Sequence, residues 1–244
     1  MSFIKPIFIL LLAAFTFLQC TKTENPPSEN LAVIPAKHEG WGMEQFEKIN
    51  DVVKQNQGEI DLLFIGDSIT QRWAEAGKPV WDKFYSHRKA VNIGISGERT
   101  EHILWRLENG NIDGIYPKVS IVLIGTNNVG VGRFTAEQTV DGVRAVVSSL
   151  VEKRPDTKII LMGIFPRGHS FNEQRVIITQ INQALAKLHD GETVYFMDIG
   201  HTFVDEDGFI SEELMPTGVH PSEKGFRIWA EALEPLIVEL LGEN

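Results

Sequence analysis

The sequence predicts an α/β protein of three layers, in which helices cover both faces of a doubly wound, five-stranded parallel sheet. Five apolar runs of strand length alternate with helical patterns along the chain. Several of these runs are almost continuously apolar, which is typical of strands covered by helices on both faces. Alternating strands and helices indicate parallel strands joined by right-handed crossovers. After the N-terminal segments about 200 residues remain, enough for one well-buried domain.

Residues 1–20 resemble an export signal. Lys5 supplies a positive charge, residues 7–18 are apolar, and Cys20 follows at the expected cleavage point. An apolar core of this length is too short to span a bilayer and fits a signal sequence. The cysteine resembles the lipidated residue of bacterial lipoproteins, although Gln19 departs from the small residue usual before it. We therefore expect an exported protein, either a periplasmic or cell-surface lipoprotein tethered to a membrane through Cys20 or a secreted one.

Residues 21–38 are predicted to form a flexible tether, because they combine prolines and charges without a helical stripe. The predicted domain occupies residues 39–244. A helical pattern begins at Trp41 and ends near Gly58, with apolar residues on one face. Strands are predicted at residues 61–66, 90–95, 119–125, 158–164 and 193–198. Further helices are predicted at residues 100–108, 136–153, 173–189 and 222–241.

Composition excludes several classes of function. The formal net charge of −10 argues against nucleic acid or an anionic membrane surface as the main partner. A single cysteine excludes an intrachain disulfide. No histidine or carboxylate cluster has metal-ligand spacing, and no glycine run has dinucleotide-site spacing, so we expect no metal and no cofactor. The sequence carries no signal for an oligomeric state.

Ligands bind parallel sheets outside the carboxyl ends of the strands, so the residues after each strand form the candidate site. Ser68 follows the first strand, Gly97 the second and Asn127 the third, while His220 lies beyond the fifth. Alone, the Gly-Asp-Ser run around Ser68 is also ordinary turn and helix-capping chemistry. Acyl transfer, however, needs a nucleophile, a base and donors for an oxyanion, and these four residues are of the required types.

These blocks resemble those of the SGNH or GDSL esterases and acylhydrolases, from residue 61 to the last helix. The resemblance implies a flavodoxin-like SGNH fold, with Ser68 as the nucleophile and His220 as the base. It also implies an oxyanion hole formed by the Ser68 and Gly97 N–H groups and the Asn127 amide. Three stretches are similar to the branch of the platelet-activating-factor acetylhydrolase α subunits and of bacterial carbohydrate O-acetylesterases: residues 102–107, 125–128 and 166–168.

The resemblance implies a serine esterase that removes short acyl groups, with acetyl on carbohydrate as the expected substrate. One alternative is hydrolysis of lysophospholipids or other lipid esters. A second is a catalytically impaired carbohydrate-binding module, because Thr217 stands where the family has an aspartate three residues before the histidine. A threonine can orient the imidazole but carries no charge to stabilise the imidazolium. Asp205 and Asp207 lie in the same loop, without a spacing that places either at His220.

Three further residues are candidate substrate contacts. Asp67 lies beside the nucleophile, although anchoring its own loop through backbone N–H groups also fits an aspartate there. Trp73 follows soon after Ser68 and is a candidate platform for a sugar ring. Arg167 is a candidate for holding an anionic or sugar group, or for a structural ion pair. His38 is expected at the solvated surface, whereas a pocket role stays open for His169 and His201.

Overall fold

The structure is a computed structural model that describes residues 29–130 and 132–243, so the predicted export signal and Cys20 lie outside the described residues. Five parallel strands form one sheet in the order β2-β1-β3-β4-β5. The strands are β1 (Gly58–Gly66), β2 (Ala90–Asn92), β3 (Ile115–Leu123), β4 (Lys158–Met162) and β5 (Val194–Met197). The predicted three-layer fold with a doubly wound sheet is confirmed.

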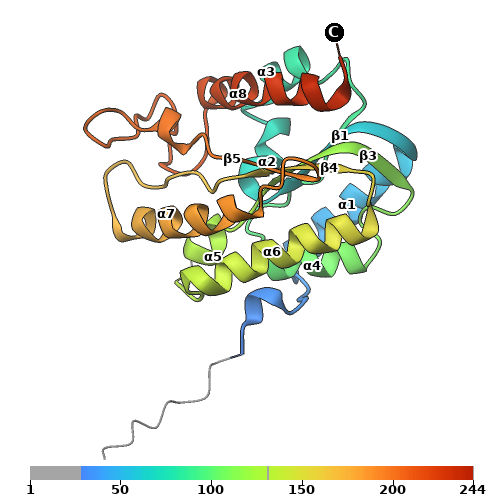
Figure 1. Ribbon diagram of the computed structural model, residues 1–244, viewed down its shortest axis with the longest axis horizontal. Helices are drawn as coiled ribbons and strands as arrows, with labels where there is room; N and C mark the ends of the chain where they lie inside the picture. The colour runs from blue at the N-terminus through green and yellow to red at the C-terminus, as the bar shows by residue number, and fades with distance from the viewer. Residues whose placement is uncertain (1–28, 131, 244) are drawn as a thin grey trace, which may run out of the picture.

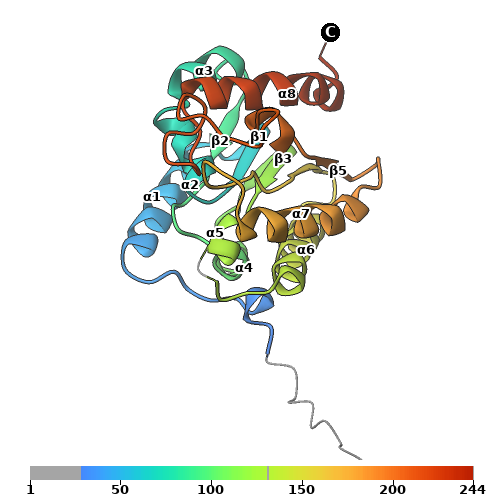
Figure 2. The same cartoon turned by 90° about the vertical axis from the view of Figure 1, so that its left-hand side faces the viewer.

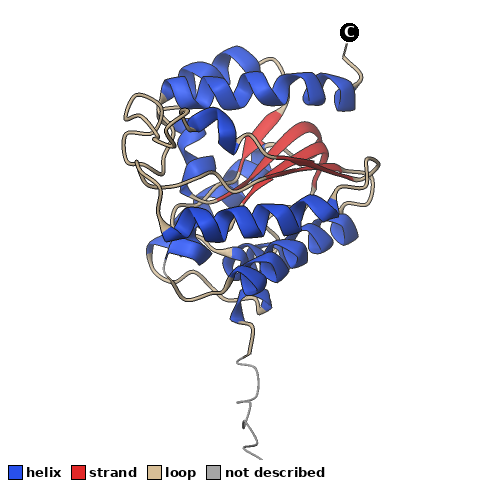
Figure 3. Cartoon of the chain, turned by 60° about the vertical axis from the view of Figure 1, so that its left-hand side comes forward, coloured by secondary structure: helices blue, strands red, loops and turns tan. Residues whose placement is uncertain are grey.

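Helices cover both faces of the sheet (Figure 1). One layer contains α1 (Trp41–Gln55), α4 (Thr100–Glu108), α6 (Ala136–Lys153) and α7 (Glu173–Leu185). The opposite layer contains α3 (Lys78–Phe84) and α8 (Glu223–Leu241). Two short helices follow strands of the sheet. Helix α2 (Ser68–Gln71) follows β1, and helix α5 (Thr126–Gly130) follows the loop that leaves β3. Figure 3 shows the sheet between the two helical layers.

Alternating side chains of the strands feed two hydrophobic cores. Leu63 and Ile65 of β1 pack into the core beneath α1, α4, α6 and α7. Leu62 and Phe64 of the same strand pack into the core beneath α3 and α8. All four side chains are fully buried. Burial on both faces explains why the strand is a continuous apolar run rather than an alternating one.

The observed element boundaries differ from the predicted ones mainly where loops leave the sheet. The predicted strand 90–95 ends at Asn92, whose Oδ1 accepts from Gly94 N–H at 2.9 Å. Asn92 Nδ2 donates to Thr70 O at 2.9 Å, so the chain turns toward α2 instead of continuing in the sheet. The predicted helix 173–189 ends at Leu185 and continues as a 3₁₀ turn. Helices α3 and α5 are not predicted from the sequence.

Residues 30–38, here called the N-terminal strap, pack against the domain, so the prediction of a flexible tether is wrong for them. The Asn30 side chain caps a 3₁₀ turn (Leu31–Val33) by accepting from Ala32 N–H at 3.1 Å. Ala36 N–H donates to the α4 carbonyl of Glu101 at 3.0 Å. Prolines disfavour helix, but they do not prevent a segment from being fixed by such bonds. Over the described part of the chain, no helix is both long and apolar enough to cross a membrane.

Candidate active site

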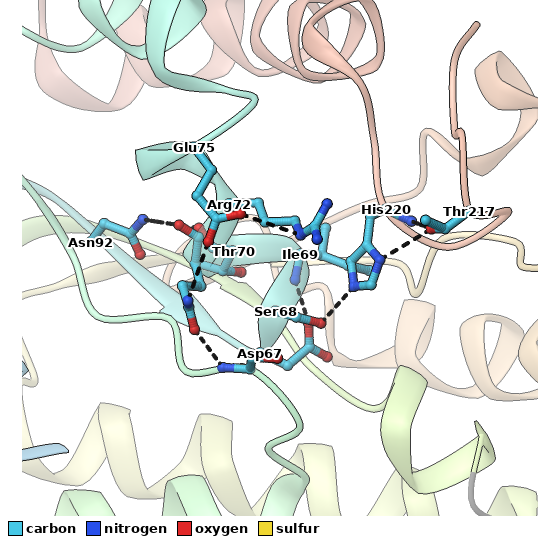
Figure 4. Close-up of polar contacts among 11 residues, drawn as sticks. Asp67, Ser68, Ile69, Thr70, Arg72, Glu75, Asn92, Thr217 and His220 are labelled. Atoms are coloured by element: carbon cyan, nitrogen blue, oxygen red, sulfur yellow. Dashed lines mark hydrogen bonds and ion pairs between the residues drawn. The ribbon is translucent and has the colours of Figure 1, made fainter. Parts of the chain in front are cut away.

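The structure brings Ser68 and His220 together at the carboxyl ends of the strands (Figure 4). Ser68 begins α2 directly after β1, and Asp67 caps this helix by accepting from Ile69 N–H at 2.9 Å. His220 lies in the loop before α8, and its Nε2 is 2.9 Å from Ser68 Oγ. This is the contact through which an imidazole removes a proton from a serine hydroxyl.

Thr217 contacts the other nitrogen of the imidazole. Its Oγ1 lies 3.1 Å from His220 Nδ1 and also accepts from the backbone N–H groups of Val219 at 3.3 Å and His220 at 3.0 Å. A hydroxyl has two lone pairs and one proton. The two backbone N–H groups occupy the lone pairs, so the Thr217 hydroxyl interacts with Nδ1 by donating its proton. Donation to Nδ1 requires the ring proton on Nε2, the atom that must be free to accept from Ser68. Thr217 therefore favours the tautomer opposite to the one a general base needs.

No carboxylate hydrogen-bonds to His220 within residues 29–130 and 132–243. Asp205 Oδ1 instead accepts from the N–H groups of Asp207 and Phe209, at 3.1 Å and 2.7 Å, and so closes its own turn. Burial lowers the pKa of the His220 imidazole, and the positive charges of Arg72 and Arg167 lower it further. The candidate base is therefore neutral at neutral pH, because the negative charge of Glu75 offsets only part of this lowering.

Gly97 and Asn127 are the residues from which the sequence predicts donors for an oxyanion. Gly97 has φ +77° and is exposed, and among the described residues neither its N–H nor that of Ser68 donates a hydrogen bond. Glycine fits the backbone conformation at this position. Asn127 Nδ2 donates to Glu98 O at 2.8 Å, which orients the amide and leaves its second proton free.

Two contacts fix the loop that carries Gly97. The backbone N–H of Ser96 donates to Gln71 Oε1 at 2.8 Å, which joins this loop to α2. Below it, Arg106 Nη2 pairs with Glu98 Oε2 at 2.7 Å, and both side chains are almost fully buried. Arg106 also donates to Ile93 O at 2.8 Å. This buried pair is not predicted from the sequence, where the available signal is an arginine among the apolar residues of the predicted helix 100–108.

The prediction of Trp73 as a sugar platform is wrong. Its side chain is fully buried, and its ring packs against Phe226 and Trp229 with centroids 4.5 Å and 5.0 Å away. The 3₁₀ turn after α2 directs the ring into the core beneath α8. A residue close to Ser68 in sequence is thus part of the core.

Asp67 and Arg167 stabilise loops of the site. Asp67 is fully buried, which excludes the predicted contact with a substrate, and it caps α2 as the alternative interpretation expects. Arg167 is half-buried and its Nη1 donates to Thr126 O at 2.7 Å. The arginine therefore holds the start of α5, which carries Asn127.

The other histidines after the strands hydrogen-bond neither Ser68 nor His220 among the described residues. His201 lines a mainly apolar cavity of about 490 Å³ together with Phe171 and Asp198, and neither Ser68 nor His220 lines it. His169 Nδ1 contacts Ile210 O at 3.0 Å and joins two loops. Among the described residues no group of three or more histidine, cysteine, aspartate or glutamate side chains is placed to hold a metal ion.

Burial raises the pKa of Asp67 to about 7, and the hydrogen bond from Ile69 N–H and the charge of Arg167 offset only part of this effect. The ordinary pKa of an aspartate is 3.8, so the folded state binds this proton more tightly than the unfolded chain. The contribution of this proton to the free energy of unfolding is fully present below the ordinary pKa of 3.8 and is lost as the pH rises through about 7. Asp67→Asn should therefore reduce the loss of unfolding free energy between about pH 5 and about pH 8, measured in urea. Asp207→Asn, on an exposed loop, is the control, and an equal reduction there would contradict the prediction.

Comparisons with known proteins show which family the chain resembles. The model of the GDSL-like lipase/acylhydrolase family matches residues 64–228. Platelet-activating factor acetylhydrolase IB subunit alpha1 of Homo sapiens is 34% identical over 222 residues, which cover 91% of this chain and 93% of that protein. The alpha2 subunit of Rattus norvegicus is 38% identical over 187 residues, which cover 76% of this chain and 80% of that protein.

Two solved structures show the same fold at lower sequence identity. A GDSL-like lipase from Bacteroides thetaiotaomicron superposes with a TM-score of 0.63 and 20% identity, covering 80% of this chain and 97% of its own. A variant of an acetyl xylan esterase from Geobacillus stearothermophilus gives a TM-score of 0.57 and 24% identity, covering 77% and 97%. At these identities the likeness establishes the fold alone.

Proposed function

Since the chain belongs to the GDSL-like lipase/acylhydrolase family, we propose that it removes acetyl and other short acyl groups from carbohydrate esters by a Ser–His mechanism. Family membership makes it a carboxylic ester hydrolase. The observation that carries the proposed mechanism is the 2.9 Å contact between His220 Nε2 and Ser68 Oγ. The N–H groups of Ser68 and Gly97 donate no hydrogen bond among the described residues, which supports a role for them in acyl transfer.

In the proposed reaction, Ser68 Oγ attacks the ester carbonyl while its proton passes to His220 Nε2. The N–H groups of Ser68 and Gly97 and the Asn127 amide stabilise the oxyanion of the tetrahedral intermediate. The intermediate collapses when His220 returns the proton to the leaving alcohol, which leaves an acyl-Ser68 enzyme. Water then attacks the acyl group, His220 accepts its proton, and the acid leaves as Ser68 regains a hydrogen.

Two relatives support acetyl as the acyl group, because both names describe removal of acetyl: platelet-activating factor acetylhydrolase and acetyl xylan esterase. Carbohydrate is supported by the second name, by the predicted export signal and by the acidic composition. The binding-module alternative is favoured by one observation, the hydroxyl of Thr217 in place of a carboxylate at His220.

The test is hydrolysis by the purified full chain of p-nitrophenyl acetate, butyrate and octanoate, together with acetate release from acetylated xylo-oligosaccharides. Ser68→Ala provides the blank. We expect the acetyl esters to react fastest and to react faster than with the blank. A preference for octanoate would favour a lipid acylhydrolase. Rates equal to the blank on every ester, with calorimetric binding of the oligosaccharide, would favour the binding module.

A further inference from the structure

His38, which the sequence predicts to lie at the solvated surface, is half-buried beside the candidate active site. Its ring stacks on the ring of His102, with centroids 4.6 Å apart and planes inclined by 5°. His102 is held in turn by Arg99, whose backbone N–H donates to His102 Nδ1 at 3.2 Å. The ring of His38 also covers Gly42, where a Cβ atom would collide with it. The imidazole therefore has a defined position in the fold.

Buried hydrogen bonds hold the N-terminal strap that carries this ring. Thr100 Oγ1 donates to Ala32 O at 2.8 Å, and Asn128 Nδ2 donates to the same hydroxyl at 3.0 Å. All three residues are fully buried. Gly142 of α6 leaves the space for this junction, because a Cβ atom there would lie 2.9 Å from Ala32 O. Figure 2 shows the strap running from this point below the helices to α1. The strap is thus joined to the segment that carries Asn127.

The ring of His38 lies next to Gly97. A Cβ atom built on Gly97 would be 3.6 Å from His38 Cε1 and 4.0 Å from His38 Nε2. Apart from the chain neighbours Ser96 and Glu98, no other side chain of the described residues lies within 4 Å of that point. The Nε2 edge of His38 therefore lies against the exposed residue Gly97.

The surroundings of His38 indicate which nitrogen carries the proton. Nδ1 is buried and has no hydrogen-bond partner within the described part of the chain. A buried N–H without an acceptor is rarer in proteins than a buried acceptor without a donor, so the proton belongs on Nε2. Burial and the charges of Arg99 and Arg106 lower the pKa of His38, which keeps the ring neutral with one N–H.

We propose that His38 is a substrate-binding residue of this site, whose Nε2–H donates to an oxygen of the bound ester beside Gly97. The proposal rests on the proposed esterase function and adds to it. The matched family region begins at residue 64, so His38 is supplied by the chain that precedes it. Ester and sugar oxygens are the acceptors that an uncharged N–H donor recognises. Because the strap fixes the ring in advance, binding would require little ordering of this donor.

The test compares His38→Gln with His38→Met in the full chain. The two side chains have similar length and neither keeps the ring stack, but only glutamine carries an N–H near the position of Nε2. We expect kcat/KM for p-nitrophenyl acetate and for acetylated xylo-oligosaccharide to fall about tenfold in His38→Met and about threefold or less in His38→Gln. The thermal midpoints of the two variants should agree.

Equal kcat/KM in the two variants would overturn the proposal, because a purely structural role depends on packing and not on the N–H. His38→Phe keeps a ring to stack on His102 and should also lose about tenfold; wild-type kcat/KM in this variant would likewise overturn the proposal. Ser68→Ala separates the two levels of inference. A wild-type chain no faster than Ser68→Ala would overturn the proposed esterase function itself. An active wild type, with equal kcat/KM in His38→Gln and His38→Met, would overturn only the proposed role of His38.

Discussion

Replacing Thr217 by aspartate is expected to raise kcat for p-nitrophenyl acetate by about 100-fold. A carboxylate at this position accepts a hydrogen bond from Nδ1–H of His220, sets the tautomer in which Nε2 is free, and stabilises the imidazolium. In serine proteases, loss of the corresponding charge lowers kcat by about 10⁴-fold. The gain should be smaller here because Thr217 is exposed, and water weakens the interaction of a charge at this position.

The pH profile gives a second measure of the same substitution. His220 has a lowered pKa in the wild type, so the base stays neutral below its ordinary value of 6.5 and activity should extend to lower pH. The introduced carboxylate would raise this pKa because it stabilises the charged ring, so the acid limb of kcat/KM should move to higher pH. Thr217→Asn is the matched control, since the amide has the shape of the aspartate without its charge. Wild-type kcat and an unshifted acid limb in Thr217→Asp would contradict the interpretation of Thr217.

The strands of this fold are predictable because helices bury both faces of the sheet. The mainly apolar run at residues 158–164 predicts β4 directly. The observed strand ends at Met162, two residues before the predicted end. The end of β2 is not predictable in this way, because residues 93–95 follow it without a polar break. Asn92 ends the strand by bonding to Thr70, which lies 22 residues earlier in the chain. Such a contact depends on the fold and has no local signal.

The candidate site is predictable in its positions but not in its orientations. Parallel strands place their carboxyl ends at one edge, so Ser68 and His220 could be assigned to one site although 152 residues separate them. The role of the Thr217 hydroxyl depends on two backbone N–H groups that converge on it only in the folded loop. Trp73 is directed into the core by α8, and His38 reaches Gly97 through the packed strap. These outcomes require tertiary contacts.

Replacing Asn127 by alanine is expected to lower kcat by about 100- to 1,000-fold, as for loss of one oxyanion donor. The amide is only partly buried, and its hydrogen bond to Glu98 O orients it without filling a core position. Its second proton acts on charge that develops in the transition state, so KM should change little. Steady-state kinetics with p-nitrophenyl acetate, together with urea unfolding, measure the two effects separately.

The neighbouring asparagine provides the contrast that makes this prediction specific. Asn128 is fully buried, and its Oδ1 accepts from Thr100 N–H at 3.2 Å while its Nδ2 donates to Thr100 Oγ1 at 3.0 Å. Asn128→Ala should therefore lower the free energy of unfolding by about 1–3 kcal/mol, because it leaves buried polar groups unpaired. Asn127→Ala should lower kcat with a smaller loss of stability. If Asn127→Ala instead lost stability like Asn128→Ala and kept its kcat, the amide would be a structural group, and the oxyanion would be held by the N–H groups of Ser68 and Gly97 alone.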